Sequence, residues 1–531
     1  MADMARTLIT VATVAGVLCS NGCGSDAGPS QPTTPGGLQV SGIGTDARSR
    51  VPFALQPRVQ VVDVSGAPVA EAGISIEAAM TSGDGQLLGT TAMVTSTSGV
   101  AVYTDLAVAG PVGQKTLTFT SDGIGSTSAA VELSAGMPAT VVANTDGLLS
   151  GVPGGTTDEV PAVLVSDQDD NPVPEVRVSF AVIEGGGTLS ETSALTDVAG
   201  IARVSEWTLG SAVGMNAVQA AVDAPGVTGS PVAFNAYAFP SFSQVPTTGP
   251  QPSFATGVTF NRTRGTIALV NPYTGVWELD PGGGSWTQLV ATVPGAGRIY
   301  ASVHEATQRL LVISETQGPS YFDYETSTWV DAGEGDAPGP RSYPGMVYDA
   351  ANSRVLLYGG VVAGGSSNPV AELFAWSGEQ WTRLADPPAG PRGGHGMAYD
   401  PLSAEIFVHG GTNFGNPTGG VAVQDTWVIR ASGEWEQVAT LSSPLAGFGM
   451  AFEEMRRTLV LVGGTLLGSG GYGLSDGVWE LVNGSWLLSP VRSPGGARVY
   501  DSVMYVPQLG RIVLYGSEHA GWNDLWFYGP G

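Results

Sequence analysis

The sequence contains almost no cysteine. Its two cysteines, Cys19 and Cys23, both lie close to the N-terminus. The rest of the chain therefore has neither a disulfide framework nor a thiolate metal site. With 42% hydrophobic residues the chain can still bury sizeable apolar cores. We expect globular domains that hold no metal and no other cofactor.

Basic residues are also scarce. The chain has 21 Lys and Arg against 47 Asp and Glu, which gives a net charge of −26. Nucleic-acid binding depends on Lys and Arg that displace counterions from phosphates, so nucleic acid is not an expected partner. A strongly acidic surface instead keeps an exported protein soluble.

Long hydrophobic runs are absent, and a single shorter one stands near the N-terminus. Arg6 precedes an apolar run from Leu8 to Leu18, which is too short to span a bilayer and has the length of a signal-peptide core. The sequence therefore predicts an exported protein.

The residues after this run, GCGSD around Cys23, resemble the signal of a bacterial lipoprotein, in which a cysteine is lipidated and becomes the new N-terminus. The resemblance implies a signal over residues 1–23 and a linker over 24–37. It also implies a location in the bacterial cell envelope, at the outer surface or in the periplasm, with the lipid as the only membrane contact. Ser20 and Asn21 depart from the family pattern, so lipidation at Cys19 and plain secretion remain alternatives.

Two segments of about a hundred residues follow the linker and align with each other. VVDVSGAPV from Val61 matches LVSDQDDNPV from Leu164, and each segment shows short alternating strands broken by Gly, Asn and Pro turns. This pattern predicts two β-sandwiches, at 38–135 and 136–238. The recurring D-x-x-G/N-x-P-V turn resembles bacterial immunoglobulin-like domains of the invasin and intimin type, which implies stalk or adhesion modules without catalysis.

The turn DQDDN in the second segment has the odd-position spacing of a calcium loop, at Asp167, Asp169 and Asn171. An EF-hand would continue with Gly at its sixth position and Glu at its twelfth, where this chain has Pro172 and Val178. We therefore expect a solvated hairpin turn in which Asp and Asn tolerate unusual backbone angles.

The C-terminal half repeats one unit. YDAANSRVLLYGG from Tyr348 returns as YDPLSAEIFVHGG from Tyr399, and related units begin at Phe260, Val303, Phe452 and Tyr505. A repeat of 43 to 53 residues made only of strands and turns predicts a β-propeller with one four-stranded blade per unit. The continuous apolar run Val355–Tyr358 indicates a strand buried on both faces, as in a blade between two neighbours. The sequence therefore predicts a six-bladed propeller over residues 239–531.

An aromatic strand and an aromatic anchor follow each complete unit, for example Phe374 and Trp381. Their fixed place favours packing between blades over a sugar-binding platform. Double glycine followed by tryptophan resembles the kelch repeat, the propeller of the galactose oxidase central domain. That family's copper centre needs a cysteine cross-linked to tyrosine, which this chain lacks after Cys23. The last unit has no anchor, and Phe242–Val245 is expected to supply its outer strand and close the ring.

Candidate binding residues gather at one mouth of the predicted channel. Blades 3 to 5 have long loops at residues 361–371, 412–424 and 465–475, and the second loop contains Asn413 and Asn416. Three arginines each lie seven residues before a unit, and a histidine lies beside one of them: Arg341, Arg392, Arg498 and His395. In kelch propellers an equivalent arginine can face the mouth and bind acidic ligands. The alternative is that these arginines bond to carbonyl groups of the blades.

The expected function is non-catalytic recognition of a glycan or protein ligand by a propeller raised on an immunoglobulin-like stalk. No nucleophile elbow, zinc-protease helix or phosphate loop occurs, and the four histidines fall at different positions of the repeat. A carbohydrate-active enzyme remains possible, because a propeller brings distant carboxylates together. A purely structural envelope protein is the third alternative.

Overall fold

The computed structural model describes residues 34–247, 256–365, 367–413, 422–468, 471–499, 502–516 and 525–529. Every helix or strand assigned in these residues is a β-strand, which confirms the all-β prediction. No helix in the described residues is long and apolar enough to cross a membrane. The expected signal peptide and the lipidation at Cys23 lie outside the described residues.

The chain divides into two compact units. The first contains residues up to Ala139 together with Ser166–Val173, and the second contains Thr140–Val165 and Pro174 onward. The turn at Ser166–Val173 therefore belongs to the first unit, although the sequence alignment assigns it to the second segment.

Two sheets share one core in the first unit. Val59 and Val61 from one sheet and Leu117 and Phe119 from the other are fully buried in the same apolar cluster. The three-stranded sheet has the order β1 (Gly37–Ser41), β3 (Arg58–Val62), β7 (Val100–Val102). The five-stranded sheet has the order β2 (Asp46–Arg48), β10 (Gly125–Ser134), β9 (Gly113–Ser121), β4 (Ser75–Ser82), β6 (Ala92–Val94), and a separate pair is formed by β5 (Gln86–Leu88) and β8 (Ala107–Ala109).

The second segment repeats this strand order, as the sequence alignment predicts. Its three-stranded sheet has the order β11 (Thr140–Ala143), β13 (Ala162–Ser166), β17 (Ile201–Arg203). Its five-stranded sheet has the order β12 (Leu149–Gly151), β20 (Val232–Ala238), β19 (Gly214–Val222), β14 (Arg177–Glu184), β16 (Ser193–Leu195), and β15 (Thr188–Leu189) pairs with β18 (Trp207–Thr208).

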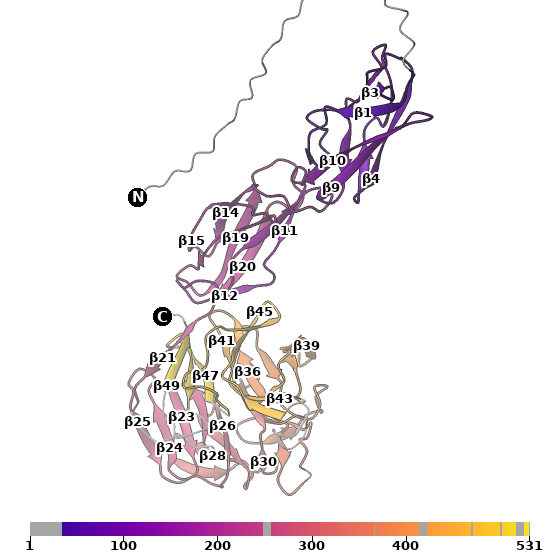
Figure 1. Ribbon diagram of the computed structural model, residues 1–531. Helices are drawn as coiled ribbons and strands as arrows, with labels where there is room; N and C mark the ends of the chain where they lie inside the picture. Colours follow the sequence, from indigo (N-terminus) through magenta and orange to yellow (C-terminus); the bar gives the residue numbers. More distant parts are fainter. Residues whose placement is uncertain are drawn as a thin grey trace, which may run out of the picture. The chain divides into compact units, whose positions relative to one another are not determined.

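The described part of residues 241–529 forms six four-stranded antiparallel sheets, the blades of a β-propeller (Figure 1). From the innermost strand outward, blades 1 to 3 are β22 (Gly257–Asn261), β23 (Thr266–Asn271), β24 (Gly275–Leu279), β25 (Trp286–Val290); β26 (Ile299–His304), β27 (Arg309–Ser314), β28 (Ser320–Asp323), β29 (Thr328–Asp331); and β31 (Gly345–Asp349), β32 (Arg354–Tyr358), β34 (Leu373–Trp376), β35 (Trp381–Arg383). Blades 4 to 6 are β36 (Gly396–Asp400), β37 (Glu405–His409), β38 (Asp425–Ile429), β39 (Trp435–Thr440); β41 (Gly449–Glu453), β42 (Thr458–Val462), β45 (Val478–Val482), β46 (Ser485–Leu488); and β47 (Ser502–Val506), β48 (Arg511–Tyr515), β49 (Leu525–Gly529), β21 (Ser241–Val245).

Apolar clusters between neighbouring blades hold the ring together. In β23, Ile267 and Leu269 pack against blade 6, whereas Ala268 and Val270 pack against blade 2. Similar clusters join each remaining pair of neighbours. This arrangement confirms that the continuous apolar runs mark strands buried on both faces.

The first residue of the repeat also links blades. Tyr348 Oη accepts the N–H of Ala306 in the blade before it at 3.3 Å, and Tyr399 Oη accepts the N–H of Ala351 at 3.2 Å. The anchor tryptophans also form hydrogen bonds to the chain just after the preceding blade, since Trp381 Nε1 donates to the Ala332 carbonyl at 2.8 Å. These contacts explain the fixed place of the aromatic residues and favour packing between blades.

The segment before the first blade closes the ring. β21 pairs antiparallel with β49, with Phe242 opposite Tyr528 (Figure 1). This pairing confirms the expectation for Phe242–Val245. It covers the last edge that blade 6 would otherwise expose.

The propeller has two ends with different connections. The turn end carries the turns between first and second strands, and the loop end carries the connections between second and third strands. The loop-end connections span only residues 272–274 and 315–319 in blades 1 and 2. They span residues 359–372, 410–424 and 463–477 in blades 3, 4 and 5. β21 begins at the turn end, so the chain enters the propeller opposite the long loops.

Candidate functional site

The three predicted arginines at the loop end are almost completely buried. Arg341 is 1% exposed, and Arg392 and Arg498 are 0% exposed. In each, Nη1 donates to the carbonyl of the glycine that follows the second strand: Gly359 at 3.1 Å, Gly410 at 3.3 Å and Gly516 at 2.9 Å. The repeated geometry favours the alternative in which these arginines bond to blade carbonyls, and ligand binding by them stays a prediction.

Two of these arginines join both ends of a long loop. Arg341 bonds Gly359 at the start of loop 359–372 and lies 3.3 Å from Glu372 at its end. Arg392 bonds Gly410 at the start of loop 410–424, and its Nη1 lies 2.9 Å from Asp425, directly after that loop. Because the arginine side chains are buried, these contacts fix the ends of the loops more firmly than surface ion pairs would.

The long loops of blades 3 and 5 are further held by small sheets. In blade 3, β30 (Arg341–Ser342) pairs with β33 (Val361–Val362). In blade 5, β40 (Leu445–Ala446) pairs with β43 (Thr465–Gly468), which forms a hairpin with β44 (Gly471–Leu474). In both blades, the segment that leads into the first strand therefore pairs with the loop between the second and third strands.

His395 is 7% exposed and lies at the loop end of blade 4. Neither of its ring nitrogens has a hydrogen-bond partner among the described residues. Burial, together with the charge of Arg392, lowers the pKa of His395 well below its ordinary value. Its imidazole is therefore neutral at physiological pH.

The two predicted asparagines and the two remaining buried histidines are placed differently. Asn413 is exposed at the start of its loop, and Asn416 lies outside the described residues. His304 accepts a hydrogen bond from Thr307 N–H at Nδ1, at 3.3 Å, and its Nε2 lies 2.8 Å from the Ser353 carbonyl. His409 Nδ1 lies 2.9 Å from Thr426 Oγ1. These two histidines serve the fold, and no cluster of His, Cys, Asp or Glu suited to a metal ion occurs among the described residues.

A chain of hydrogen bonds runs around the loop-end rim. Tyr343 N–H donates to Tyr300 Oη at 2.7 Å, and Gly394 N–H donates to the Tyr343 carbonyl at 2.9 Å. Gly447 N–H then donates to the Gly394 carbonyl at 2.8 Å. The chain links blades 2, 3, 4 and 5. Tyr343 was not predicted as a site residue, although it lies two residues after Arg341.

The channel holds a cavity of about 210 Å³ that the innermost strands of all six blades line. This volume is below the roughly 300 Å³ at which pockets for drug-sized ligands begin. A molecule inside the channel would therefore have to be small.

Charged residues surround the turn end of the channel. Arg262 of blade 1 forms an ion pair with Glu454 of blade 5, and its backbone N–H donates to Glu305 of blade 2 at 3.3 Å. Burial raises the pKa of Glu305, although Arg262 partly offsets this effect. These residues were not predicted, but each stands two positions after the first residue of a unit, so an alignment of the repeats could have found them.

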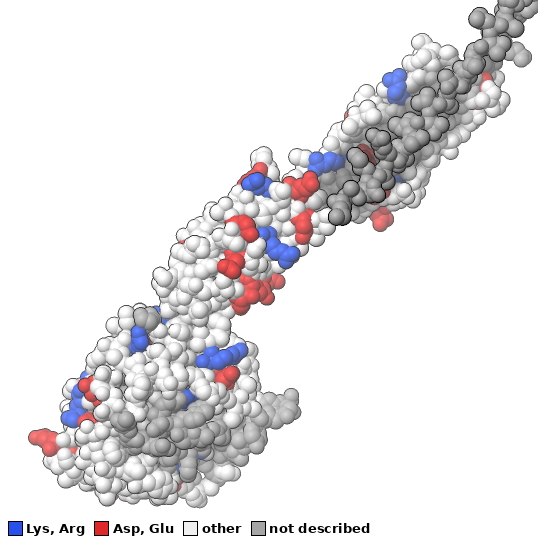
Figure 2. Space-filling view, turned by 60° about the vertical axis from the view of Figure 1, so that its left-hand side comes forward, with Lys and Arg blue, Asp and Glu red and all other residues white. Residues whose placement is uncertain are grey.

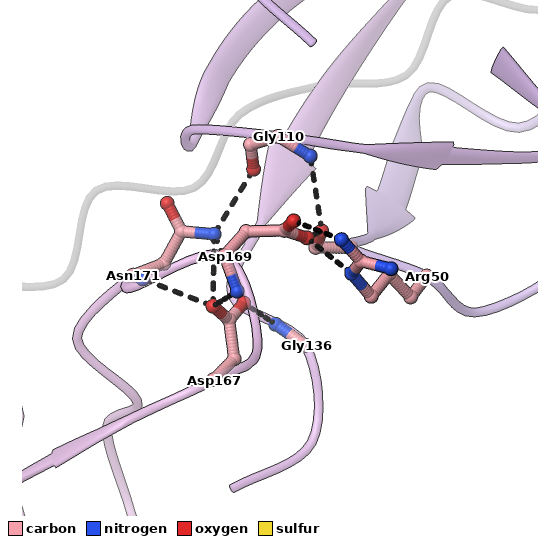
Figure 3. A network of polar contacts seen from close by, with 7 residues as sticks. Arg50, Gly110, Gly136, Asp167, Asp169 and Asn171 are labelled. Atoms are coloured by element: carbon pink, nitrogen blue, oxygen red, sulfur yellow. Dashed lines mark hydrogen bonds and ion pairs between the residues drawn. The ribbon is translucent and has the colours of Figure 1, made fainter. Parts of the chain in front are cut away.

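The DQDDN turn forms a network within the first unit (Figure 3). Asp167 Oδ1 accepts the N–H groups of Asp169 and Asn171 at 2.8 and 2.9 Å, and its Oδ2 accepts the Gly136 N–H at 2.7 Å. Both carboxylate oxygens of Asp169 accept hydrogen bonds from Arg50. The carboxylates that a calcium ion would need are thus already bonded, which supports a structural role for this turn. The expectation that the turn is solvated is wrong for Asp167 and Asn171, which are only 2% and 4% exposed because they bond to the first sandwich.

No protein-family model and no curated protein matches this chain. Three of the solved structures that resemble the chain illustrate a distant similarity. YjhT has 16% identity and a TM-score of 0.43, with 53% of this chain and 95% of YjhT covered. A protein of unknown function from Bacteroides thetaiotaomicron has 13% identity and a TM-score of 0.38, with 73% and 98% covered. A fungal alcohol oxidase of the AA5 family, solved in complex with copper, has 14% identity and a TM-score of 0.39, with 70% and 76% covered. Likenesses this weak carry no argument about activity, and the propeller assignment rests on the strand pairing.

Proposed function

We propose that this chain is an exported, lipid-anchored protein of the bacterial cell envelope whose propeller recognises a glycan without catalysis. In this proposal the two N-terminal sandwiches are immunoglobulin-like stalk modules of the invasin and intimin type, and the propeller is of the kelch type. A protein ligand is the alternative within the same class.

The observation that carries the proposal is the difference between the short and long connections at the loop end. Blades 3, 4 and 5 are neighbours, and each extends its connection at the same end of the channel. Loops that only connect strands tend to be short, and extra length supported by a rigid scaffold is typical of binding surfaces. The buried contacts of Arg341 and Arg392 hold the ends of two of these loops in place. Loop ends that are already ordered lower the entropy lost on binding.

The charges at this end favour an uncharged ligand. Arg341 and Arg392 are paired with Glu372 and Asp425, so they leave little positive charge for an acidic ligand. Much of the protein surface in view is also uncharged (Figure 2). An uncharged sugar is recognised through hydrogen bonds and ring stacking. It therefore suits such a surface better than an acidic sugar does.

A glycan array tests this proposal, using the chain without residues 1–23. We expect binding to one or more uncharged glycans, and we expect that binding to change little between 50 and 500 mM salt, since few charges take part. Binding to acidic glycans, if salt abolishes that binding, would contradict the proposal that the ligand is uncharged. Binding to no glycan would contradict glycan recognition altogether.

Membrane fractionation tests the lipid anchor. Cys23→Ala is expected to move the protein from the membrane fraction to the soluble one, whereas Cys19→Ala is expected to leave it in the membrane fraction. The reverse result would identify Cys19 as the lipidated residue. Release of neither variant would contradict lipidation at a single cysteine.

A carbohydrate-active enzyme is the second candidate, and the turn end of the channel favours it. Glu305 has a raised pKa, as a general acid requires, and Glu454 of blade 5 forms an ion pair with Arg262. Hydrolysis of an array glycan that Glu305→Gln abolishes would establish this activity. A glycan that is bound and never cleaved would exclude it for that ligand.

A further inference from the structure

Three residues at the loop-end rim share one unusual backbone conformation. Tyr343, Gly394 and Gly447 each stand five residues before the first residue of their unit. Their φ angles are 60°, 65° and 65°, and all three belong to the hydrogen-bond chain around the rim. The rim therefore requires the left-handed conformation at this position in blades 3, 4 and 5.

Tyr343 is an outlier at this position. Glycine adopts the left-handed conformation without steric cost, which accounts for Gly394 and Gly447. A bulky side chain is strained there, because its Cβ approaches the carbonyl oxygen that follows. The fold thus needs only glycine at this position, and tyrosine makes the rim less stable than glycine would.

A second departure from the repeat occurs next to it. His395 directly follows Gly394. The corresponding residue is apolar in blades 2, 3 and 5 (Ile299, Pro344, Phe448) and polar in blades 1 and 6 (Thr256, Asp501). Like Ile299 and Phe448, His395 packs over the first strand of the preceding blade, so close that a Cβ on Gly345 would lie 2.4 Å from Nε2. Both ring nitrogens lack a partner among the described residues, and an unsatisfied buried polar group is unfavourable.

The two departures lie at the same seam. Tyr343 belongs to blade 3 and His395 to blade 4, and the hydrogen bond from Gly394 N–H to the Tyr343 carbonyl joins them. The long loop of blade 3 reaches this seam, because a Cβ on Gly393 would lie 3.7 Å from Cβ atoms of both Pro369 and Tyr343. Strain and unsatisfied polar groups that collect at one place are typical of functional sites.

We propose that the seam between blades 3 and 4 at the loop end is a sugar-binding site. The Tyr343 ring stacks against the apolar face of an uncharged pyranose, and the His395 imidazole forms a hydrogen bond to a hydroxyl group or to a water molecule that reaches the seam. This inference rests on the proposed function of glycan recognition and identifies where that recognition occurs.

The chemistry of these residues fits such a ligand. A tyrosine ring offers a rigid apolar surface, and the C–H groups on one face of a pyranose pack well against it. Tyr343 is only half-buried, and Arg298, which directly precedes the first strand of blade 2, lies over one face of its ring at 4.8 Å. The sugar would therefore stack on the opposite face of the ring. A neutral imidazole has one donor and one acceptor and can serve either side of a hydroxyl hydrogen bond.

Tyr343→Gly separates a binding role from a structural one. Because glycine suits the left-handed conformation, the variant is expected to melt at the same temperature as the wild type or a few degrees higher. Its affinity for the glycan found on the array is expected to fall about tenfold or more, since the stacking surface is lost. Tyr273→Gly is the matched control, because Tyr273 is also at the loop end, in blade 1, and is 68% exposed. This control should keep the affinity of the wild type.

The outcomes distinguish this inference from the proposed function. If the melting temperature of Tyr343→Gly falls by several degrees, Tyr343 stabilises the fold, and the inference is overturned whatever the binding result. Unchanged affinity in Tyr343→Gly would overturn the inference and leave glycan recognition standing. If the wild-type chain binds no glycan on the array, both the inference and the proposed function fail.

Discussion

The ring of Phe242 lies 4.8 Å from the ring of Tyr528, with 39° between the two planes. These residues stand at opposite ends of the propeller sequence and face each other across the pairing of β21 with β49. The contact therefore holds the ring closed.

Phe242→Ala is expected to destabilise the propeller by about 1 to 3 kcal/mol, less than a fully buried phenylalanine would, because Phe242 is only partly buried. Urea unfolding of the full chain measures this difference. Tyr273→Ala, at an exposed tyrosine away from the closure, should change the free energy of unfolding by less than about 0.5 kcal/mol. Equal effects of the two substitutions would show that the ring closes without Phe242.

Arg341→Ala and Arg392→Ala are each expected to destabilise the chain by about 2 to 4 kcal/mol, because each removes a buried ion pair and leaves a glycine carbonyl without its donor. Arg492→Ala is the matched control, since Arg492 is 52% exposed and pairs with the exposed Asp476. Thermal unfolding checks the three variants. Arg341 and Arg392 variants that remain as stable as the control would restore these arginines as candidates for direct ligand binding.

Acid is expected to weaken the fold through its buried histidines. Burial lowers the pKa of His304, His395 and His409, that of His409 to about 3. In the unfolded chain each has an ordinary pKa of about 6.5, so the unfolded state binds more protons below that pH. The stability due to these histidines is therefore complete above about pH 6.5 and decreases as the pH falls, by up to about 1.4 kcal/mol per pH unit for each histidine.

His395→Phe tests the contribution of one of these histidines, since Phe448 occupies the same position in blade 5. Urea unfolding at pH 7.5 and pH 5 should show a smaller loss of stability in this variant than in the wild type. The comparison with wild type removes the opposing effect of Glu305, whose raised pKa favours the folded state in acid. The same loss in both proteins would mean that folding does not lower the pKa of His395.

Asp167→Ala should destabilise the first unit by about 1 to 3 kcal/mol, because this 2% exposed carboxylate accepts three backbone N–H groups. Calcium and EDTA should leave the melting temperature of the wild type unchanged. Ser65→Ala is the control, because Ser65 corresponds to Asp169 in the first repeat and is exposed. A rise in melting temperature with calcium that Asp167→Ala abolishes would support a metal site instead.

The fold could be predicted because its signals are periodic. The repeated units at Tyr348 and Tyr399 carry the aromatic residue, the turn and the two-sided apolar strand that each blade needs, and the closing role of Phe242 follows from one missing strand. Every unit must pack against two neighbouring blades, so the same residue types recur at the same positions of the repeat.

The site could not be predicted in the same way. Arg341, Arg392 and Arg498 recur like ligand-binding residues, but sequence alone does not show that their side chains are buried and bonded to glycine carbonyls. At Tyr343, an alignment with Gly394 would show the substitution, whereas its cost depends on a φ angle that only the structure provides.

Hydrogen–deuterium exchange with and without the best glycan from the array tests the central claim most directly. If the loop end recognises the glycan, binding should slow exchange in residues 341–345, 359–372 and 392–396 and leave the turns at 262–265, 305–308 and 454–457 unchanged. Slower exchange confined to those turns would place the ligand at the opposite end of the channel, near Glu305 and Glu454, and contradict the account.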